Sequence, residues 1–204
     1  RAAVAAGAEV VVMDDGHQNP SLAKALSLIV VDGETREGEW PFGDGAVFPS
    51  GPMREPFETG LARTDAVILL LPADLEAAEQ DLIALFGTTL VLTARLSPEG
   101  PPPSGRQLAF AGIGKPWKFE RALKAAGCDL ADFIALADHQ AYDEGILKAL
   151  AAQADVLEAG LLTTEKDWVR LPPVWRERIA AWPVRAQFED EAAALALLRS
   201  AVRA

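Results

Sequence analysis

Residues 107–126 read QLAFAGIGKPWKFERALKAA. The first five residues form an apolar run as long as a buried strand, and two glycines and a proline follow it closely. Apolar side chains then recur at helical spacing over residues 117–126, and Pro116 suits the first turn of that helix. A strand, a tight turn and a helix in this order predict an α/β fold.

The same alternation continues on both sides of this unit. Further strands are expected at residues 9–13, 28–31, 67–71, 88–94, 132–136, 160–164 and 184–188, most of them on apolar runs. Helical spacing marks residues 74–86, 143–154 and 191–202, with a short helical turn expected at 22–26. The pattern predicts mostly parallel sheets flanked by helices.

Two stretches rich in glycine and proline divide the sequence. Four prolines fall within residues 97–105, which predicts a boundary between a domain at 1–104 and a smaller α/β domain at 105–204. Residues 34–56 are too irregular for regular elements. A loop of that length is usually functional or disordered.

Composition excludes several classes of protein. Half of the 204 residues are hydrophobic, which argues against disorder, and the net charge of -11 argues against binding of nucleic acid. Cys128 is the only cysteine, so no internal disulfide forms and a reducing, cytoplasmic setting is expected. No apolar run approaches the roughly 20 residues of a membrane-spanning helix.

The sequence opens at Arg1 within an alanine-rich stretch that ends at Gly7. This start resembles the end of a helix with a glycine C-cap and lacks the features of a signal peptide. We therefore expect a fragment whose N-terminal part is missing.

The first candidate site is the acidic pair Asp14 and Asp15, directly after the apolar run at 9–13. Carboxylates at the carboxyl end of a strand can hold Mg²⁺, as a Walker B aspartate does. The alternative is that both acids cap the following turn. No Walker A loop is present. The nearest segment is 112–116, where the two glycines are only two positions apart and a proline stands in place of the serine or threonine.

The second candidate is the segment PSGPMREP at residues 49–56. Proline and glycine fix the loop path, Arg54 offers the planar fork that suits a phosphate, and Glu55 could orient it. A surface salt bridge in a rigid loop explains the same residues equally well.

Two further candidates follow later strands. Asp138 and His139 come after the run at 132–136, where a histidine beside an acid can move protons, although a capping or packing role is commoner. In the segment LLTTEKD at 161–167, Lys166 could reach an anion. The favoured interpretation there is Thr164 as an N-cap with Asp167 as its capping-box acid.

Five segments, in chain order, resemble the motifs of the tetraacyldisaccharide 4′-kinases of Gram-negative bacteria. MDDGHQNP resembles Asp-Asp-Gly-Phe-Gln-Asn/His, and FGDG with PSGPMREP resembles Gly-Asn-Gly and Ala-Gly-Pro-Leu-Arg-Glu-Pro. AFAGIGKPWKF resembles Ala-Phe-Ala-Gly-Ile-Gly-x-Pro-x-Lys-Phe, DHQAY resembles Asp-His-His-x-Tyr/Phe, and TTEKDWVRL resembles Thr-Thr-Glu-Lys-Asp-x-Val-Arg-Leu. The ordered set is far more specific than any single match.

The resemblance implies a P-loop-kinase-like domain that transfers a phosphoryl group from ATP to the 4′-hydroxyl of tetraacyldisaccharide 1-phosphate in lipid A biosynthesis. Asp14 and Asp15 would be Walker B acids for Mg²⁺, with Gln18 beside the metal. Arg54 and Glu55 would surround phosphate and substrate. Such a site works by positioning groups and by neutralising charge.

The resemblance further implies that His139 pairs with an aspartate upstream of this chain to activate the hydroxyl. Asp138 and Lys166 are the remaining candidates for binding substrate or nucleotide. The family's N-terminal third carries the P-loop and a helix that associates with the cytoplasmic face of the inner membrane. Without that segment, we expect this chain to have little activity.

His17 stands where the family has an aromatic residue, and Gln140 stands where it has a second histidine. Two other classes of function compete with the kinase. The absent P-loop would fit a noncatalytic module that binds nucleotide or lipid. A receiver-like phospho-acceptor domain fits poorly, given the glycine-proline loop and the chain length.

Overall fold

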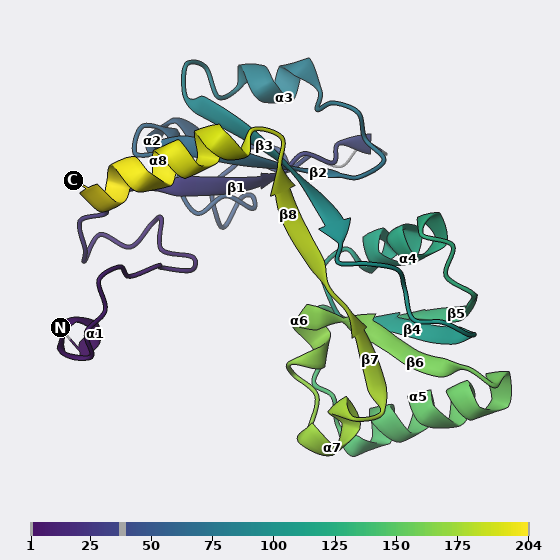
Figure 1. The fold of residues 1–204 in the computed structure, drawn as a ribbon. Coiled ribbons are helices and arrows are strands. Elements are labelled where there is room, and N and C mark those ends of the chain that lie inside the picture. Colours follow the sequence, from purple (N-terminus) through teal and green to yellow (C-terminus); the bar gives the residue numbers. More distant parts are fainter. Residues whose placement is uncertain (1, 37–39, 204) are drawn as a thin grey trace. The chain divides into compact units, whose positions relative to one another are not determined.

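The computed structural model describes residues 2–36 and 40–203, which form two compact units of mixed α/β structure (Figure 1). Unit 1 comprises Arg1–Ser97 and Ala186–Ala204, and unit 2 comprises Pro98–Arg185. The expected boundary at 104/105 therefore lies inside unit 2. The expected second domain also gives its last residues to unit 1, because the final strand joins the first sheet and the final helix packs on it.

Unit 1 is built on a four-stranded sheet in the order β1-β2-β3-β8. Its strands are β1 (Leu28–Asp32), β2 (Ala66–Pro72), β3 (Leu90–Pro98) and β8 (Val184–Phe188). The first three are parallel, as the sequence predicts. β1 lies at one edge, which leaves Val30 62% exposed although a buried strand was expected there.

The central strand β2 buries both faces, so its side chains alternate between two clusters. Val67 and Leu69 pack with Leu82 of α3 (Gln80–Ala84), in a cluster that α2 (Phe57–Leu61) also joins. Ile68 packs on the opposite face with Ala194 of α8 (Glu191–Arg203). Apolar runs buried on two sides are the signature of parallel sheets.

Unit 2 repeats this architecture with the strand order β5-β4-β6-β7, all parallel. Its strands are β4 (Gln107–Ala111), β5 (Leu130–Ala135), β6 (Gly160–Thr164) and β7 (Ile179–Trp182). Every residue of β4 is buried. β4 is the first element of residues 107–126, the stretch that predicted an α/β fold.

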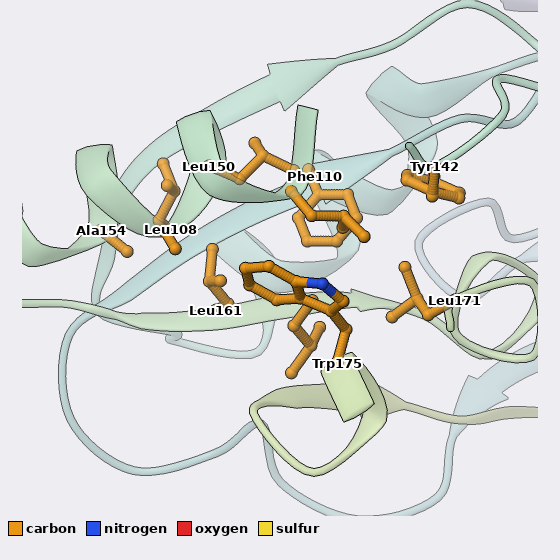
Figure 2. Close-up of a cluster of buried hydrophobic side chains, with 11 residues drawn as sticks. Leu108, Phe110, Tyr142, Leu150, Ala154, Leu161, Leu171 and Trp175 are labelled. Atoms are coloured by element: carbon orange, nitrogen blue, oxygen red, sulfur yellow. The ribbon is translucent and has the colours of Figure 1, made fainter. Parts of the chain in front are cut away.

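Helices cover both faces of the second sheet (Figure 1). Leu108 and Phe110 pack against α5 (Glu144–Leu157) and Trp175 of α7 (Pro173–Arg176), as Figure 2 shows. Ala109 and Ala111 face α4 (Pro116–Ala125) in a separate cluster. The short helix α6 (Glu165–Trp168) directly follows β6.

The apolar run at residues 9–13 does not form the expected strand. No described strand pairs with it, and Val10, Val11 and Val12 are 55%, 58% and 90% exposed. An extended segment becomes a strand only beside a neighbour that pairs with its N–H and C=O groups.

Two other local predictions are wrong in part or in whole. The helical turn expected at 22–26 is absent, and the helix expected at 74–86 is reduced to α3. None of the helices in the described ranges is long and apolar enough to cross a membrane.

Candidate active site

The acidic pair lies in a tight turn that faces the glycine-proline loop. Asp15 has a φ of 52°, and a Cβ on Gly16 would come within 2.6 Å of Met13 Cβ, so this turn needs a glycine. Arg54 Nη1 donates to Asp15 Oδ1 and Oδ2 at 2.7 and 2.8 Å. Both side chains are about two-thirds exposed, so water weakens the ion pair.

The loop holds Arg54 in place through its own backbone hydrogen bonds. The Phe48 N–H donates to the Met53 carbonyl at 2.8 Å, and the Met53 N–H donates to the Ala46 carbonyl at 3.0 Å. A Cβ on Gly51 would lie 2.5 Å from the Ala46 carbonyl oxygen, so only glycine fits there. Within the stretch expected to be irregular, residues 46–53 therefore form a compact loop.

Glu55 turns away from Arg54 and makes a second cluster. It accepts two hydrogen bonds from Arg63 Nη2, at 2.7 and 2.9 Å, and one from Gln18 Nε2 at 3.1 Å. The hydrogen bonds from Arg63 lower the pKa of Glu55. This corrects the expectation that Glu55 orients Arg54, since Asp15 does so instead.

His17 links the acidic turn to two other elements of unit 1. Its Nε2 lies 3.0 Å from the Gly60 carbonyl, and its Nδ1 lies 2.8 Å from Ser27 Oγ. A carbonyl only accepts, so Nε2 carries the proton and, in the neutral ring, Nδ1 accepts from the serine. In the sequence, His17 is notable only as a departure from a family motif, and no pattern predicts these two hydrogen bonds.

A cavity of about 1410 Å³ in unit 1 runs along these residues. Its polar lining includes the site residues predicted for this unit: Asp14, Asp15, Gln18, Arg54 and Glu55. Its apolar lining includes residues of the 9–13 run, of β1 and of α8: Val10, Val11, Val12, Leu28, Ile29, Val30, Leu198 and Val202. A concave site with a few converging polar groups is the usual form of a ligand site.

The acidic turn has the chemistry to bind a metal ion whose remaining ligands come from a bound phosphate and from water. No group of three or more histidine, cysteine or acidic residues that could hold a metal occurs within residues 2–36 and 40–203. Mg²⁺ is commonly held by one or two carboxylates together with phosphate oxygens and water. The exposed Asp14, with Asp15 and Gln18 beside it, fits that kind of site.

In unit 2, the Asp138–His139 turn follows β5 and lies beside the loop that follows β4. His139 has a φ of 57°, and its N–H lies 3.2 Å from the Gly112 carbonyl and 3.0 Å from Asp138 Oδ1. The imidazole is 73% exposed, with Nε2 3.8 Å from Asp138 Oδ2. It is therefore accessible to a ligand at the carboxyl edge of the sheet.

Beneath this turn lies a buried carboxylate. Asp167 Oδ2 accepts from the Gly112 N–H at 3.0 Å and from Thr164 Oγ1 at 2.8 Å, while its own N–H donates back to Thr164 at 3.0 Å. Thr164 is thus confirmed as the N-cap, whereas the Asp167 carboxylate accepts from the Thr164 hydroxyl and from Gly112, not from the Thr164 N–H as in a capping box. Lys166 is exposed on α6, and its role as an anion ligand stays a prediction.

Arg170 completes this network and was not singled out from the sequence. It lies one turn after Asp167, with Nη1 3.3 Å from Asp167 Oδ1 and Nη2 2.7 Å from the Gln140 carbonyl. Its guanidinium stands 5.6 Å from the centre of the Tyr142 ring. Burial, and then the neighbouring Asp167 carboxylate, raise the pKa of Tyr142.

Comparisons with known proteins agree with the resemblance. The family model described as tetraacyldisaccharide-1-P 4′-kinase (LpxK) matches residues 1–203. Curated relatives named tetraacyldisaccharide 4′-kinase include one from Phenylobacterium zucineum, 69% identical over 95% of this chain, and one from Maricaulis maris, 49% identical over 98%. The chain spans 59% and 58% of the length of these two relatives.

A solved structure shares the fold. The crystal structure of LpxK from Aquifex aeolicus in complex with ATP superimposes with a TM-score of 0.58 at 19% identity, over 92% of this chain and 56% of that one. With a family model that matches nearly every residue and relatives at this level of identity, the chain belongs to the tetraacyldisaccharide 4′-kinase family.

Proposed function

We propose that the complete protein containing this chain transfers the γ-phosphoryl group of ATP to the 4′-hydroxyl of tetraacyldisaccharide 1-phosphate, with Mg²⁺. Family membership and the names of the relatives support the reaction. The structural observation that carries the proposal is the exposed Asp15–Arg54 pair on the wall of a large cavity, beside Asp14 and Gln18. An exposed arginine suits an anionic ligand, and exposed carboxylates beside it suit the metal ion bound to that ligand.

The groups of unit 1 bind and orient the phosphates. Arg54 exchanges its hydrogen bonds from Asp15 to a phosphate oxygen, which frees the Asp15 carboxylate. Asp14, Asp15 and Gln18 would then hold Mg²⁺, which neutralises charge on the phosphates. Arg63 keeps Glu55 ionised and fixed, so Glu55 leaves Arg54 free for the ligand.

The groups of unit 2 act on the acceptor. The exposed His139 imidazole takes the proton of the 4′-hydroxyl as its oxygen bonds to the γ-phosphorus and the bond from that phosphorus to the ADP oxygen breaks. Asp138 stabilises the imidazolium that results. Lys166 offers a cation to the 1-phosphate of the substrate.

The substrate places the reaction at a lipid surface. We propose that the complete protein works as a peripheral enzyme at the cytoplasmic face of the inner membrane. Its acceptor carries four acyl chains, which stay in the bilayer while the sugar is presented to the site.

The test is transfer of labelled γ-phosphate from MgATP to tetraacyldisaccharide 1-phosphate. It compares the 204-residue chain with the product of the complete gene, and the complete product with its Asp14→Asn and His139→Gln variants. We expect each substitution to reduce turnover about 100-fold or more. Asp155→Asn, at an exposed carboxylate on α5, is the matched control and should change little.

Two results would overturn the proposal. One is the absence of transfer by a folded product of the complete gene, which would favour a noncatalytic module. The other is turnover within a few-fold of the unsubstituted protein in both the Asp14→Asn and the His139→Gln variants.

A further inference from the structure

The peptide groups of Gly112 are held from both sides. The Gly112 N–H donates to the buried Asp167 carboxylate at 3.0 Å. The Gly112 carbonyl accepts from the His139 N–H at 3.2 Å and from Arg170 Nη1 at 3.5 Å. Asp167 therefore holds the Gly112 N–H, and the Gly112 carbonyl in turn holds the backbone of His139.

Arg170 holds the other side of the same turn. Its Nη2 donates to the Gln140 carbonyl at 2.7 Å, one residue beyond His139. Its Nη1 also lies 3.3 Å from Asp167 Oδ1. The Arg170 guanidinium thus contacts the Gln140 carbonyl, the Gly112 carbonyl and the Asp167 carboxylate.

Burial makes this arrangement rigid. The Asp167 side chain is fully buried, and Arg170 is 27% exposed. A buried carboxylate must keep its donors, because no water replaces them. A Cβ on Gly112 would lie 2.9 Å from the Tyr142 hydroxyl, so this position needs a glycine.

The turn needs such support because of its own backbone. His139 has a φ of 57°, in the left-handed region that a non-glycine residue adopts at a cost in free energy. Surrounding contacts must hold a residue in that conformation. Within the turn, the His139 N–H also donates to Asp138 Oδ1 and the Gln140 N–H donates to the Ala137 carbonyl, both at 3.0 Å. The hydrogen bonds from His139 to Gly112 and from Arg170 to Gln140 tie the turn to the rest of unit 2.

We propose that Asp167 and Arg170 are positioning residues that hold His139 in its reactive place, Asp167 through Gly112 and Arg170 through Gln140. Neither side chain contacts substrate. This inference rests on the proposed function, in which His139 takes the proton of the acceptor hydroxyl.

The first experiment measures the turn directly in the 204-residue chain. Amide hydrogen exchange, resolved by NMR, compares Arg170→Gln with Arg176→Gln. Arg176 is a matched control, because it too donates to two backbone carbonyls in unit 2, those of Leu171 and Val169. We expect the His139 amide to exchange at least about tenfold faster in Arg170→Gln and to be unchanged in Arg176→Gln.

The second experiment measures turnover in the product of the complete gene. Arg170→Gln should lower kcat about 10-fold to 100-fold while the KM for ATP stays within about twofold. Arg170→Lys, which keeps the charge and one hydrogen bond, should recover part of the loss. Arg176→Gln should leave kcat within about twofold even where it lowers the melting temperature.

The pH profile separates this proposal from the proposed function. The loss of kcat on the acidic side should persist in Arg170→Gln at a lower plateau, since His139 is still the base, and should disappear in His139→Gln. Full activity in His139→Gln would overturn the role of His139. An inactive His139→Gln beside an Arg170→Gln variant that matches Arg176→Gln in kcat and in amide exchange would overturn the positioning role alone.

If the unsubstituted product of the complete gene transfers no phosphate, the proposed function fails. The exchange experiment then still decides whether Arg170 holds the turn.

Discussion

Each unit carries one aspartate–arginine pair at its candidate site, and the two pairs differ in burial. Asp15 and Arg54 approach to 2.7 Å but are about two-thirds exposed. Asp167 and Arg170 stand farther apart, at 3.3 Å, yet the Asp167 carboxylate is fully buried and accepts from Gly112 and Thr164 as well. Water screens the shorter contact, whereas breaking the longer one would leave a buried charge without its partner.

This difference separates a pair that can change partners from one that cannot. Arg54 can leave Asp15 for a phosphate with little loss, since water solvates both groups in the meantime. Arg170 cannot leave Asp167 without exposing a buried charge to an apolar surrounding. The exposed pair therefore suits ligand binding, and the buried pair suits the holding of a backbone turn.

The largest effect should come from the exposed pair. Arg54→Gln in the product of the complete gene should reduce kcat/KM for phosphoryl transfer about 100-fold to 1000-fold, because a cation aimed at the transferred phosphate is lost. The melting temperature should not change measurably. A variant that melts much earlier but retains its activity would break the comparison.

The buried pair should also affect stability, which the exposed pair does not. Asp167→Ala should lower the free energy of unfolding of unit 2 by about 3 kcal/mol, because Arg170, Thr164 and the Gly112 N–H lose their acceptor. Four of the five tryptophans lie in unit 2, so their fluorescence in a urea titration reports this loss. Asp155→Ala, at an exposed carboxylate, should stay within about 0.5 kcal/mol of the parent.

His17 tests an intermediate degree of burial. His17→Phe, which keeps a flat ring, should destabilise unit 1 by about 1 to 2 kcal/mol, because the Gly60 carbonyl and the Ser27 hydroxyl lose their partner. Hydrogen exchange of the β1 and β2 amides checks this. An unchanged exchange rate would mean that water replaces the histidine without cost, as at the exposed pair.

The smallest effect concerns pH. Arg63 lowers the pKa of Glu55, so the ion pair contributes stability above the ordinary glutamate pKa of 4.5 and loses it as the pH falls through the lower pKa of the folded state. Arg63→Gln should therefore flatten the decline of melting temperature between pH 5 and pH 3. A steeper decline in the variant would contradict the assignment.

Sequence patterns predicted best the parts of the fold that are buried on both faces. The bounds of β4 and β6 match the predicted ranges, because apolar runs between turn residues leave few other interpretations. The bounds of β8 match as well, although four of its five residues are exposed. The run at residues 9–13 has the same composition but no neighbouring strand. Short elements such as β7, with the sequence IAAW, give too little pattern to detect.

Sequence patterns selected most residues of the candidate site but did not predict how they pair. The strand-end rule led to Asp14, Asp15, Asp138 and His139, and capping chemistry led to Asp167. That Glu55 pairs with Arg63 depends on how α2 follows the loop, which no local pattern encodes. The Asp14, Asp15 and His139 roles in catalysis stay predictions.

The order of the strands has a consequence for how the protein is made. Residues of unit 2 form one continuous stretch, whereas unit 1 needs β8 and α8 from the very end of the sequence. On the ribosome, unit 2 can therefore fold while the sheet of unit 1 still lacks its last strand. Until α8 has been synthesised, Ile68 and Leu92 lack the helix that covers them. The nascent chain then exposes an apolar sheet face that is prone to aggregation and is a target for chaperones.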